Sequence, residues 1–301
     1  MWGEPAHCPM PHPVASSSTD ILPPACVCCA GASPWAARRA FLLLGAVGLL
    51  SAPAWAQVDV GKASSLRNLV PAQKLESSAA QQYSQMLAQA RAQRALAPDD
   101  HPQVQRLRAI ARKLIPYTAQ WSDRARGWQW EVNLIGSKQI NAFCMPGGKI
   151  AFYTGILDQL KLTDDEVAMI MGHEMAHALR EHARERLAKT QVTGLGLSLG
   201  AQLLGLGQAG DLAANLGTQL LTLQYSRSDE TEADLVGLEL AARAGFDPRA
   251  SVTLWQKMGA ATGNKGKLDF LSTHPSGPNR IKELEANMPK VEPLYRKSAR
   301  P

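Results

Sequence analysis

The chain has 301 residues, five cysteines and a formal net charge of +6 at pH 7. No dense basic cluster or basic–aromatic stripe appears, so nucleic acid is not an expected partner, and the charge is interpreted as a solvated basic surface. Four of the cysteines lie in the first 56 residues and only Cys144 follows, which excludes an intramolecular disulfide in residues 57–301.

The first 56 residues have the pattern of an export signal. Two arginines at positions 38 and 39 precede an uncharged apolar run over 40–50, and the small-residue pattern Ala54-Trp55-Ala56 follows. This pattern predicts that residues 1–56 are removed on export to the periplasm, by the twin-arginine or the general secretory route. A retained N-terminal anchor is the alternative. The mature chain is expected to be soluble or peripheral to a membrane.

Residues 57–301 are long enough for one domain with a substantial core. We expect residues 57–99 to form a flexible lead-in and then a helix from about 76 to 95, which is rich in Ala, Gln and Leu. A second helix is expected over 102–114, where apolar residues recur at helical spacing before Pro116.

The hydrophobic period then changes from helical to alternating. The stretch WQWEVNLI (128–135) alternates tryptophan and aliphatic residues on one face, as a strand does. INAFCMPGGKIAFYTGIL (140–157) follows, with two β-prone arms around the turn signal Met145-Pro146-Gly147-Gly148. We therefore expect a small antiparallel sheet inside a mostly helical α+β domain.

A long helix is expected over 162–189, and it carries the first metal-binding motif. Thr163 and Glu166 predict a capping box at its start. His173 and His177, four residues apart, lie one above the other on the helix and can bind a single ion. The pattern is only suggestive by itself, because a catalytic zinc site needs three protein ligands and an open position for water.

The segment 190–226 carries one charge, at Asp211, and is rich in Gly and Leu. We expect a pair of buried or lid-like helices there, with a membrane anchor as the alternative. Further helices are expected over 228–245 and 278–287, and residues 291–301 are expected to form a loose tail.

A third zinc ligand is available at the start of the helix over 228–245. Glu230 can bind the metal, and Asp234, four residues later on the same face, can accept a hydrogen bond from a ligating histidine and fix its tautomer. A solvated acidic helix start is the alternative meaning of these carboxylates. The extended histidine motif of the metzincins is excluded, because it requires glycine and histidine where this chain has Arg180 and Ala183.

With these residues the chain resembles the zinc metallopeptidase family that includes CAAX prenyl protease, HtpX and the mitochondrial Oma protease. The matching motifs are NAFCMPGGKIAFYTGIL, His173-Glu174-x-x-His177, Ser226-Arg227-x-x-Glu230-x-x-Ala233-Asp234 and STHPSGPNRI (272–281). The resemblance covers about residues 100–290 and implies a gluzincin-type metallopeptidase domain with one Zn2+ per chain and the sheet at the active-site cleft. Periplasmic BepA- and LoiP-like members are the expected closest relatives, although a C-terminal helical-repeat domain is not expected here.

The chemistry of these residues suggests their roles. Zinc, held by the two histidines and Glu230, would activate a water and polarise the scissile carbonyl. Glu174 is expected to take the proton of that water and to return it to the leaving amine. By resemblance, His274 approaches the zinc or the substrate as a regulatory ligand or an oxyanion stabiliser, and Arg280 stabilises negative charge at the same centre. The alternatives are a loop histidine and a helix-surface arginine.

The hairpin is expected to offer a strand edge to an extended substrate. The residues expected to contact that substrate are Asn141, Ala142, Phe143, Gly147, Gly148, Lys149 and Ile150. Backbone pairing of this kind gives little sequence selectivity, which suits an unfolded polypeptide. His101 and His182 are expected at the surface, and Cys144 is expected to pack as a small apolar residue.

The expected function is a periplasmic zinc endopeptidase that cleaves unfolded or misassembled envelope proteins. Peripheral contact with a membrane or with outer-membrane assembly machinery is a further expectation. One alternative is a chaperone-like envelope binding protein whose zinc site is structural or silenced, and the intact Glu174 argues against it, since a structural site needs no general base. A membrane-embedded protease anchored by residues 190–226 is another alternative.

Overall fold

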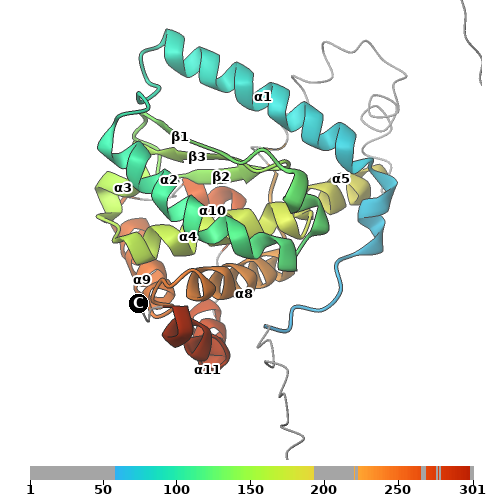
Figure 1. Ribbon diagram of the computed structural model, residues 1–301, viewed down its shortest axis with the longest axis vertical. Coiled ribbons are helices and arrows are strands. Elements are labelled where there is room, and N and C mark those ends of the chain that lie inside the picture. The colour runs from blue at the N-terminus through green and yellow to red at the C-terminus, as the bar shows by residue number, and fades with distance from the viewer. Residues whose placement is uncertain are drawn as a thin grey trace, which may run out of the picture. The chain divides into compact units, whose positions relative to one another are not determined.

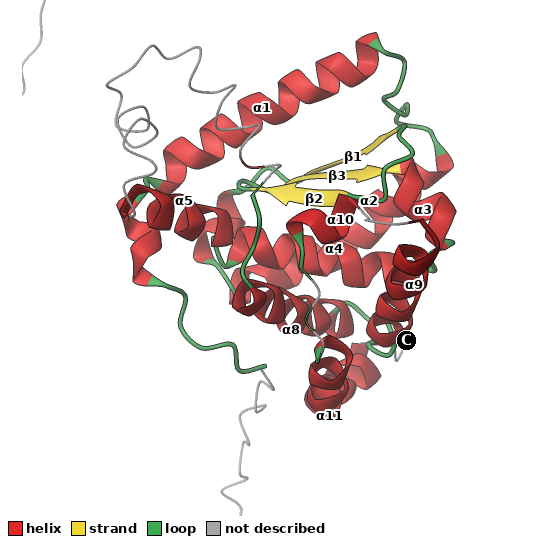
Figure 2. Cartoon of the chain, turned by 180° about the vertical axis from the view of Figure 1, so that it is seen from behind, coloured by secondary structure: helices red, strands yellow, loops and turns green. Residues whose placement is uncertain are grey.

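The computed structural model (Figures 1 and 2) describes residues 58–192, 220, 223–265, 269–275, 277 and 279–298. The predicted export signal and most of the segment 190–226 lie outside these residues. The described residues belong to one compact unit, which extends from Trp55 to Pro301. None of the helices in this described part of the chain combines the length and the apolar character needed to span a bilayer.

Helices cover both faces of a small sheet. The helical elements are η1 (Ser65–Leu69), α1 (Ala72–Ala92), α2 (Pro102–Leu114), η2 (Ile115–Gln120), η3 (Asp123–Gly127), α3 (Thr154–Leu160), α4 (Asp164–Leu179), α5 (His182–Val192), α8 (Arg227–Arg243), α9 (Ala250–Lys265), α10 (Asp269–Thr273) and α11 (Arg280–Ser298). The strands are β1 (Glu131–Ile135), β2 (Ala142–Met145) and β3 (Lys149–Tyr153). Figures 1 and 2 show α1 across one face of the sheet, α4 on the other, and α8 and α11 beyond α4. The main apolar core lies between the sheet, α2, α4 and α8.

The sheet is mixed, whereas the sequence predicted an antiparallel one. β2 and β3 form the expected antiparallel hairpin, with Cys144 opposite Ile150. β1 pairs in parallel with the other side of β3, with Val132 opposite Ile150. The connection over 136–141 leaves a gap between β1 and β2, and β3 later fills that gap. β3 is antiparallel to β2 and therefore runs parallel to β1. The mostly helical α+β class is as predicted.

The helix ends follow local sequence signals where those signals are strong. α2 has the predicted bounds. The capping box of α4 also forms as expected, because the Thr163 side chain accepts a hydrogen bond from the Glu166 amide and the Glu166 side chain accepts one from the Thr163 amide. The prediction of one continuous helix over 162–189 is wrong. The chain breaks at Glu181, whose φ of 59° is left-handed, and α5 is a separate helix.

The lead-in and the tail are both packed, whereas the sequence predicted that they were loose. Val58 is buried, and its amide donates a hydrogen bond to Oε2 of the buried Glu239 at 2.6 Å. α11 continues through two prolines into the predicted tail, where Val291 is fully buried. Pro289 and Pro293 are both exposed, so the backbone hydrogen bonds that they remove lie on the side of the helix that water can reach.

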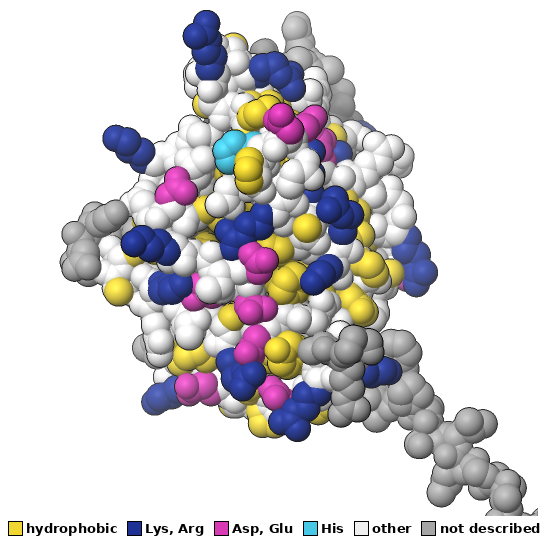
Figure 3. All heavy atoms as spheres, turned by 60° about the vertical axis from the view of Figure 1, so that its left-hand side comes forward, with side chains coloured by type: hydrophobic (Ala, Val, Ile, Leu, Met, Phe, Trp, Pro, Cys, Tyr) yellow, Lys and Arg dark blue, Asp and Glu magenta, His cyan; other side chains and the backbone are white. Residues whose placement is uncertain are grey.

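Charged side chains are mixed on the face of the molecule shown in Figure 3. Lysine and arginine side chains are scattered over that face, and acidic side chains lie between them rather than in a separate patch. This distribution agrees with the solvated basic surface inferred from the sequence.

Candidate metal centre

α4 and α8 cross in direct backbone contact, and the crossing brings the two metal motifs together. A Cβ atom at Gly172 would lie 2.8 Å from the carbonyl oxygen of Gly237, and one at Gly237 would lie 2.6 Å from the amide nitrogen of His173. Because real Cβ atoms essentially never approach other atoms this closely, the crossing requires glycine on both helices. His173 and His177 of α4 consequently face Glu230 of α8.

The three predicted ligands are spaced as a single metal ion requires. The Nε2 atoms of His173 and His177 lie 3.1 Å apart. Glu230 places Oε2 3.6 Å from Nε2 of His173 and Oε1 3.4 Å from Nε2 of His177. Ligand atoms held tetrahedrally by zinc, at about 2.0–2.1 Å from the metal, are about 3.3 Å from one another. The donor set therefore fits one zinc ion.

Buried polar atoms that lack a hydrogen bond gather at the same point. Oε1 of Glu230, Oε1 of Glu174 and Nε2 of His274 have no hydrogen-bond partner among the described residues, and all three side chains are buried. Oε2 of Glu230 has only its ion pair with Arg280. Buried polar groups in folded proteins nearly always have a partner. A divalent cation bound between these atoms would supply it.

Burial sets the protonation of the site. Burial lowers the pKa of the site histidines His173, His177 and His274. Their rings are thus neutral, as a metal ligand must be. Burial also raises the pKa of Glu230 to about 8, although the charge of Arg280 acts in the opposite direction. The pKa of Glu174 is raised well above its ordinary value by burial and by the nearby charge of Glu230. A bound cation would favour the ionised form of Glu230.

Asp234 and Arg280 support the ligands from behind. Oδ1 of Asp234 lies 3.0 Å from Nδ1 of His173. Arg280 donates two hydrogen bonds to Asp234, from Nε at 2.5 Å and from Nη2 at 2.8 Å. Nη2 of Arg280 is also 3.1 Å from Oε2 of Glu230. One guanidinium thus pairs with the carboxyl groups of both Asp234 and Glu230.

The position of Arg280 changes the role that the sequence suggested for it. Its side chain is buried, with the guanidinium 3.4 Å from the ring centre of Trp255, so it is not a surface arginine. Arg280 lines a cavity together with Glu230 and Asp234, and not the cleft that contains Glu174. This placement does not support direct contact with a substrate oxyanion.

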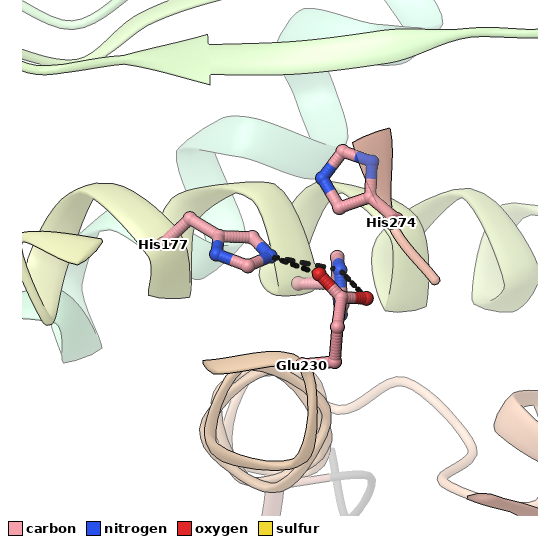
Figure 4. Close-up of side chains that lie close together, drawn as sticks. His177, Glu230 and His274 are labelled. Atoms are coloured by element: carbon pink, nitrogen blue, oxygen red, sulfur yellow. Dashed lines mark hydrogen bonds and ion pairs between the residues drawn. The ribbon is translucent and has the colours of Figure 1, made fainter. Parts of the chain in front are cut away.

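His274 follows α10 and points at the ligands (Figure 4). Its Nδ1 lies 2.9 Å from Oγ1 of Thr273 and 3.2 Å from the carbonyl oxygen of Phe270, so its Nε2 is left to face Glu174 at 3.5 Å. Together with the three predicted ligands it forms a group of four buried residues whose ligand atoms all lie within 4.8 Å of one another. His274 can therefore reach a fourth position on the same ion.

Sequence reasoning missed two residues that contact His177. His182, expected at the surface, is buried, and its Nδ1 lies 2.9 Å from Nδ1 of His177. Tyr225 stacks on the His177 ring, with ring centres 3.8 Å apart. The helical spacing gave no signal for His182, because the break at Glu181 changes the direction of every later side chain. His101 is half-buried and caps α2, since its Nδ1 accepts a hydrogen bond from the Gln103 amide.

A cleft lies beside the ligands, and β2 forms one of its walls. Its lining residues include the strand segment 141–146, Glu174, Tyr225 and His274. Hydrogen-bonded pairs alternate along an antiparallel ladder, and the Asn141 carbonyl accepts from the Tyr153 amide, so the backbone groups of Ala142 and Cys144 face away from β3. Among the described residues no other strand pairs with this edge of β2, and the Cys144 backbone hydrogen-bonds the Glu174 carboxyl group. Cys144 itself is buried, as predicted.

The other predicted substrate contacts do not form a strand edge. Lys149 and Ile150 belong to β3, which is paired on both sides, so neither can pair with a substrate. Gly147 and Gly148 form the turn with φ values of 87° and 79°, and a Cβ atom at Gly148 would lie 2.7 Å from the ring of Trp130. Of the predicted substrate contacts, only those on or next to β2 lie at an edge of the sheet.

Comparison with known proteins also identifies the chain as a metallopeptidase. The sequence profile of peptidase family M48 matches residues 101–288. Mitochondrial metalloendopeptidase OMA1 of Schizosaccharomyces pombe is 38% identical over 197 residues, which are 65% of this chain and 56% of that protein. Metalloprotease LoiP of Escherichia coli is 27% identical over 204 residues, 64% of this chain and 73% of LoiP. The beta-barrel assembly-enhancing protease of Yersinia pestis is 28% identical over 172 residues, 53% of this chain and 35% of that protein.

The match to OMA1 has a higher identity than the matches to LoiP and the beta-barrel assembly-enhancing protease, whereas the export signal pattern had suggested LoiP-like and BepA-like proteins as the nearer relatives. The chain spans only about half the length of the OMA1 protein that it matches.

Proposed function

The chain belongs to peptidase family M48, whose members are zinc-dependent metallopeptidases, and we propose that it hydrolyses peptide bonds in unfolded or misassembled proteins of the bacterial envelope. The observation that carries this proposal is the convergence of His173, His177 and Glu230 on one point, with the carboxyl group of Glu174 beside it. Zinc at that point would polarise the scissile carbonyl and acidify the attacking water.

Glu174 is the group that moves the proton. Its Oε1 is buried, accepts no hydrogen bond from any described residue and lies 3.5 Å from Nε2 of His274. A carboxyl group with a raised pKa can hold a proton between two steps, and burial raises the pKa of Glu174. It would accept a proton from the attacking water at Oε1 and deliver it to the leaving amine. This requirement for a base argues against the alternative of a binding protein with a purely structural zinc site.

The edge of β2 that faces away from β3 supports an extended, unfolded substrate. The backbone groups of Ala142 and Cys144 would pair with a peptide lying in the cleft next to Glu174. Asn141 caps the Ala142 amide with its own Oδ1 at 2.9 Å, so a substrate strand would have to displace that contact. Since such pairing uses backbone atoms, it selects for chains that are not already folded rather than for a particular sequence.

His274 would keep the resting enzyme inactive. A zinc ion held by three protein ligands offers a fourth position to water, and His274 is close enough to occupy it. His274 would then have to move away before a substrate strand could enter. Assistance at the transition state is the alternative role of this histidine.

Export to the periplasm is supported by the signal pattern in residues 38–56. Because some relatives are named mitochondrial metalloendopeptidases, the location of this protein should be tested separately from its activity. A reporter enzyme that is active only after export, fused behind residues 1–70, should be active in bacteria. The same fusion with Arg38 and Arg39 replaced by glutamine should lose that activity, and a fusion that stays inactive in the parent form would refute periplasmic location.

The activity itself is tested with purified protein and casein, a substrate that is unfolded without treatment. Cleavage is expected with zinc, and it should stop when a chelator is added and return when zinc is restored. Glu174→Gln should bind zinc and cleave at least about 100-fold more slowly, the usual scale for a general base. Glu285→Gln, on the exposed side of α11, is the matched control and should cleave like the parent. Equal rates for the parent and Glu174→Gln would refute the mechanism.

A further inference from the structure

His182 lies directly behind His177, on the side away from the other ligands. It is the first residue of α5, it is buried, and its Nδ1 is 2.9 Å from Nδ1 of His177. On its other side, Nε2 of His182 lies 3.3 Å from Oε2 of Glu232. The same oxygen accepts a hydrogen bond from Nε of Arg180 at 2.8 Å, and Nη2 of Arg180 donates to the Gly61 carbonyl at 2.9 Å. These contacts form one continuous chain.

Only one arrangement of protons satisfies this chain when His177 binds a metal through Nε2. Nε2 must then offer a lone pair, so the proton of the neutral ring is on Nδ1. That proton can be donated only if Nδ1 of His182 is an acceptor, which places the proton of His182 on Nε2. Nε2 of His182 then donates to the carboxylate of Glu232, which Arg180 holds in place.

We propose that His182 is a positioning residue for the metal ligand His177. Through its hydrogen bonds to Glu232 and to His177, it fixes the tautomer and the ring orientation of that ligand. The inference rests on the proposed metal site. The role of such outer hydrogen bonds is to aim the ligand nitrogen and to make it more basic, and their loss typically costs about 10- to 100-fold in metal affinity.

The two histidine ligands are thereby supported in parallel ways. His173 contacts the carboxylate of Asp234 directly, and Arg280 pairs with that carboxylate. His177 reaches the carboxylate of Glu232 through one intervening imidazole. Each histidine ligand is therefore connected by hydrogen bonds to a carboxylate–arginine pair. The carboxylate of Glu232, in the pair behind His177, reaches that ligand only through His182.

A merely packed histidine and a positioning histidine respond differently to substitution. In His182→Asn, the amide oxygen can take the place of Nδ1 and still accept the proton of His177. In His182→Gln the amide group lies nearer the place of Nε2, so that acceptor is lost, although the side chain is polar and of similar bulk. His182→Leu fills the space without any acceptor.

The test is zinc affinity, measured by titrating zinc-free protein in competition with a chromogenic chelator, with thermal melting of the zinc-free forms as the check on folding. His182→Gln and His182→Leu should bind zinc about 10- to 100-fold more weakly than the parent, whereas His182→Asn should stay within a few-fold of it. His101→Leu, which removes a histidine far from the site, should bind like the parent.

Two results would overturn the proposal. One is unchanged zinc affinity in both His182→Gln and His182→Leu. The other is an equal loss in His182→Asn and His182→Gln, which would indicate packing alone; this comparison remains decisive if the leucine variant does not fold. The readout is independent of proteolysis, so a parent that binds zinc but cleaves nothing would defeat the proposed function and leave this inference standing.

Discussion

Replacement of Gly237 by alanine tests whether the helix crossing builds the metal centre. The added Cβ atom would lie 2.6 Å from the amide nitrogen of His173 and 2.8 Å from the carbonyl carbon of Gly172, both on α4. Non-bonded heavy atoms pack at about 3.5 Å or more, so α8 would have to move away from α4 by about 1 Å. The contacting atoms are backbone, and no rotamer change can relieve the overlap.

The cost follows from this displacement. Overpacking of a core typically destabilises by about 1–3 kcal/mol, and the gain in helix propensity from glycine to alanine, about 1 kcal/mol, offsets part of it. Metal–ligand distances tolerate only about 0.2 Å, whereas Glu230 moves with α8 and the histidine ligands stay on α4. We expect a net loss of up to about 2 kcal/mol in the free energy of unfolding and a loss of zinc affinity of at least about tenfold.

Urea unfolding of the zinc-free protein and competition titration with zinc measure the two effects separately. Gly259→Ala is the matched control, because Gly259 lies in α9 with no atom within 4 Å of the added Cβ position. The control should gain up to about 1 kcal/mol and keep its zinc affinity. If Gly237→Ala proved as stable as the parent and bound zinc equally well, the crossing would not be what holds the site together.

Four further variants test named contacts. Glu230→Gln should lower zinc content and abolish cleavage, because the third ligand loses its charge, and full zinc occupancy with normal turnover would remove Glu230 from the site. His274→Ala should raise basal cleavage of unfolded casein if the histidine blocks the fourth metal position, and lower it if the histidine assists catalysis. Arg280→Ala should lower both zinc content and cleavage, because Glu230 and Asp234 then lose their shared arginine. Burial opposes ionisation of Glu166, but the hydrogen bonds from Lys257, the Thr163 amide and Thr253, together with the charge of Lys257, outweigh it and lower the pKa. A lowered folded-state pKa adds stability above the unfolded pKa, and that stability is lost as pH falls through the folded value. The stability difference between the parent and Lys257→Met should therefore be present at about pH 7 and shrink below about pH 4, and a difference independent of pH would contradict this reading.

The sequence by itself determined the features that depend on residues close together in the chain. The spacing of His173 and His177 put both rings on one helical face, and Thr163 with Glu166 set the start of that helix. Glu230 was selected as a ligand from its place at the start of a later helix. Each of these inferences needs only contacts within about one or two helical turns, which side-chain identity and spacing encode directly.

Only the tertiary structure decided which distant groups surround those ligands. His182 is buried behind His177 because the chain turns at the left-handed Glu181, and hydrophobic periodicity carries no signal for such a turn. Arg280 is placed behind Asp234 by the packing of α11 on α8. The parallel pairing of β1 and the continuation of α11 through its prolines have the same origin, because the burial of side chains from remote segments outweighs the local preference of the backbone.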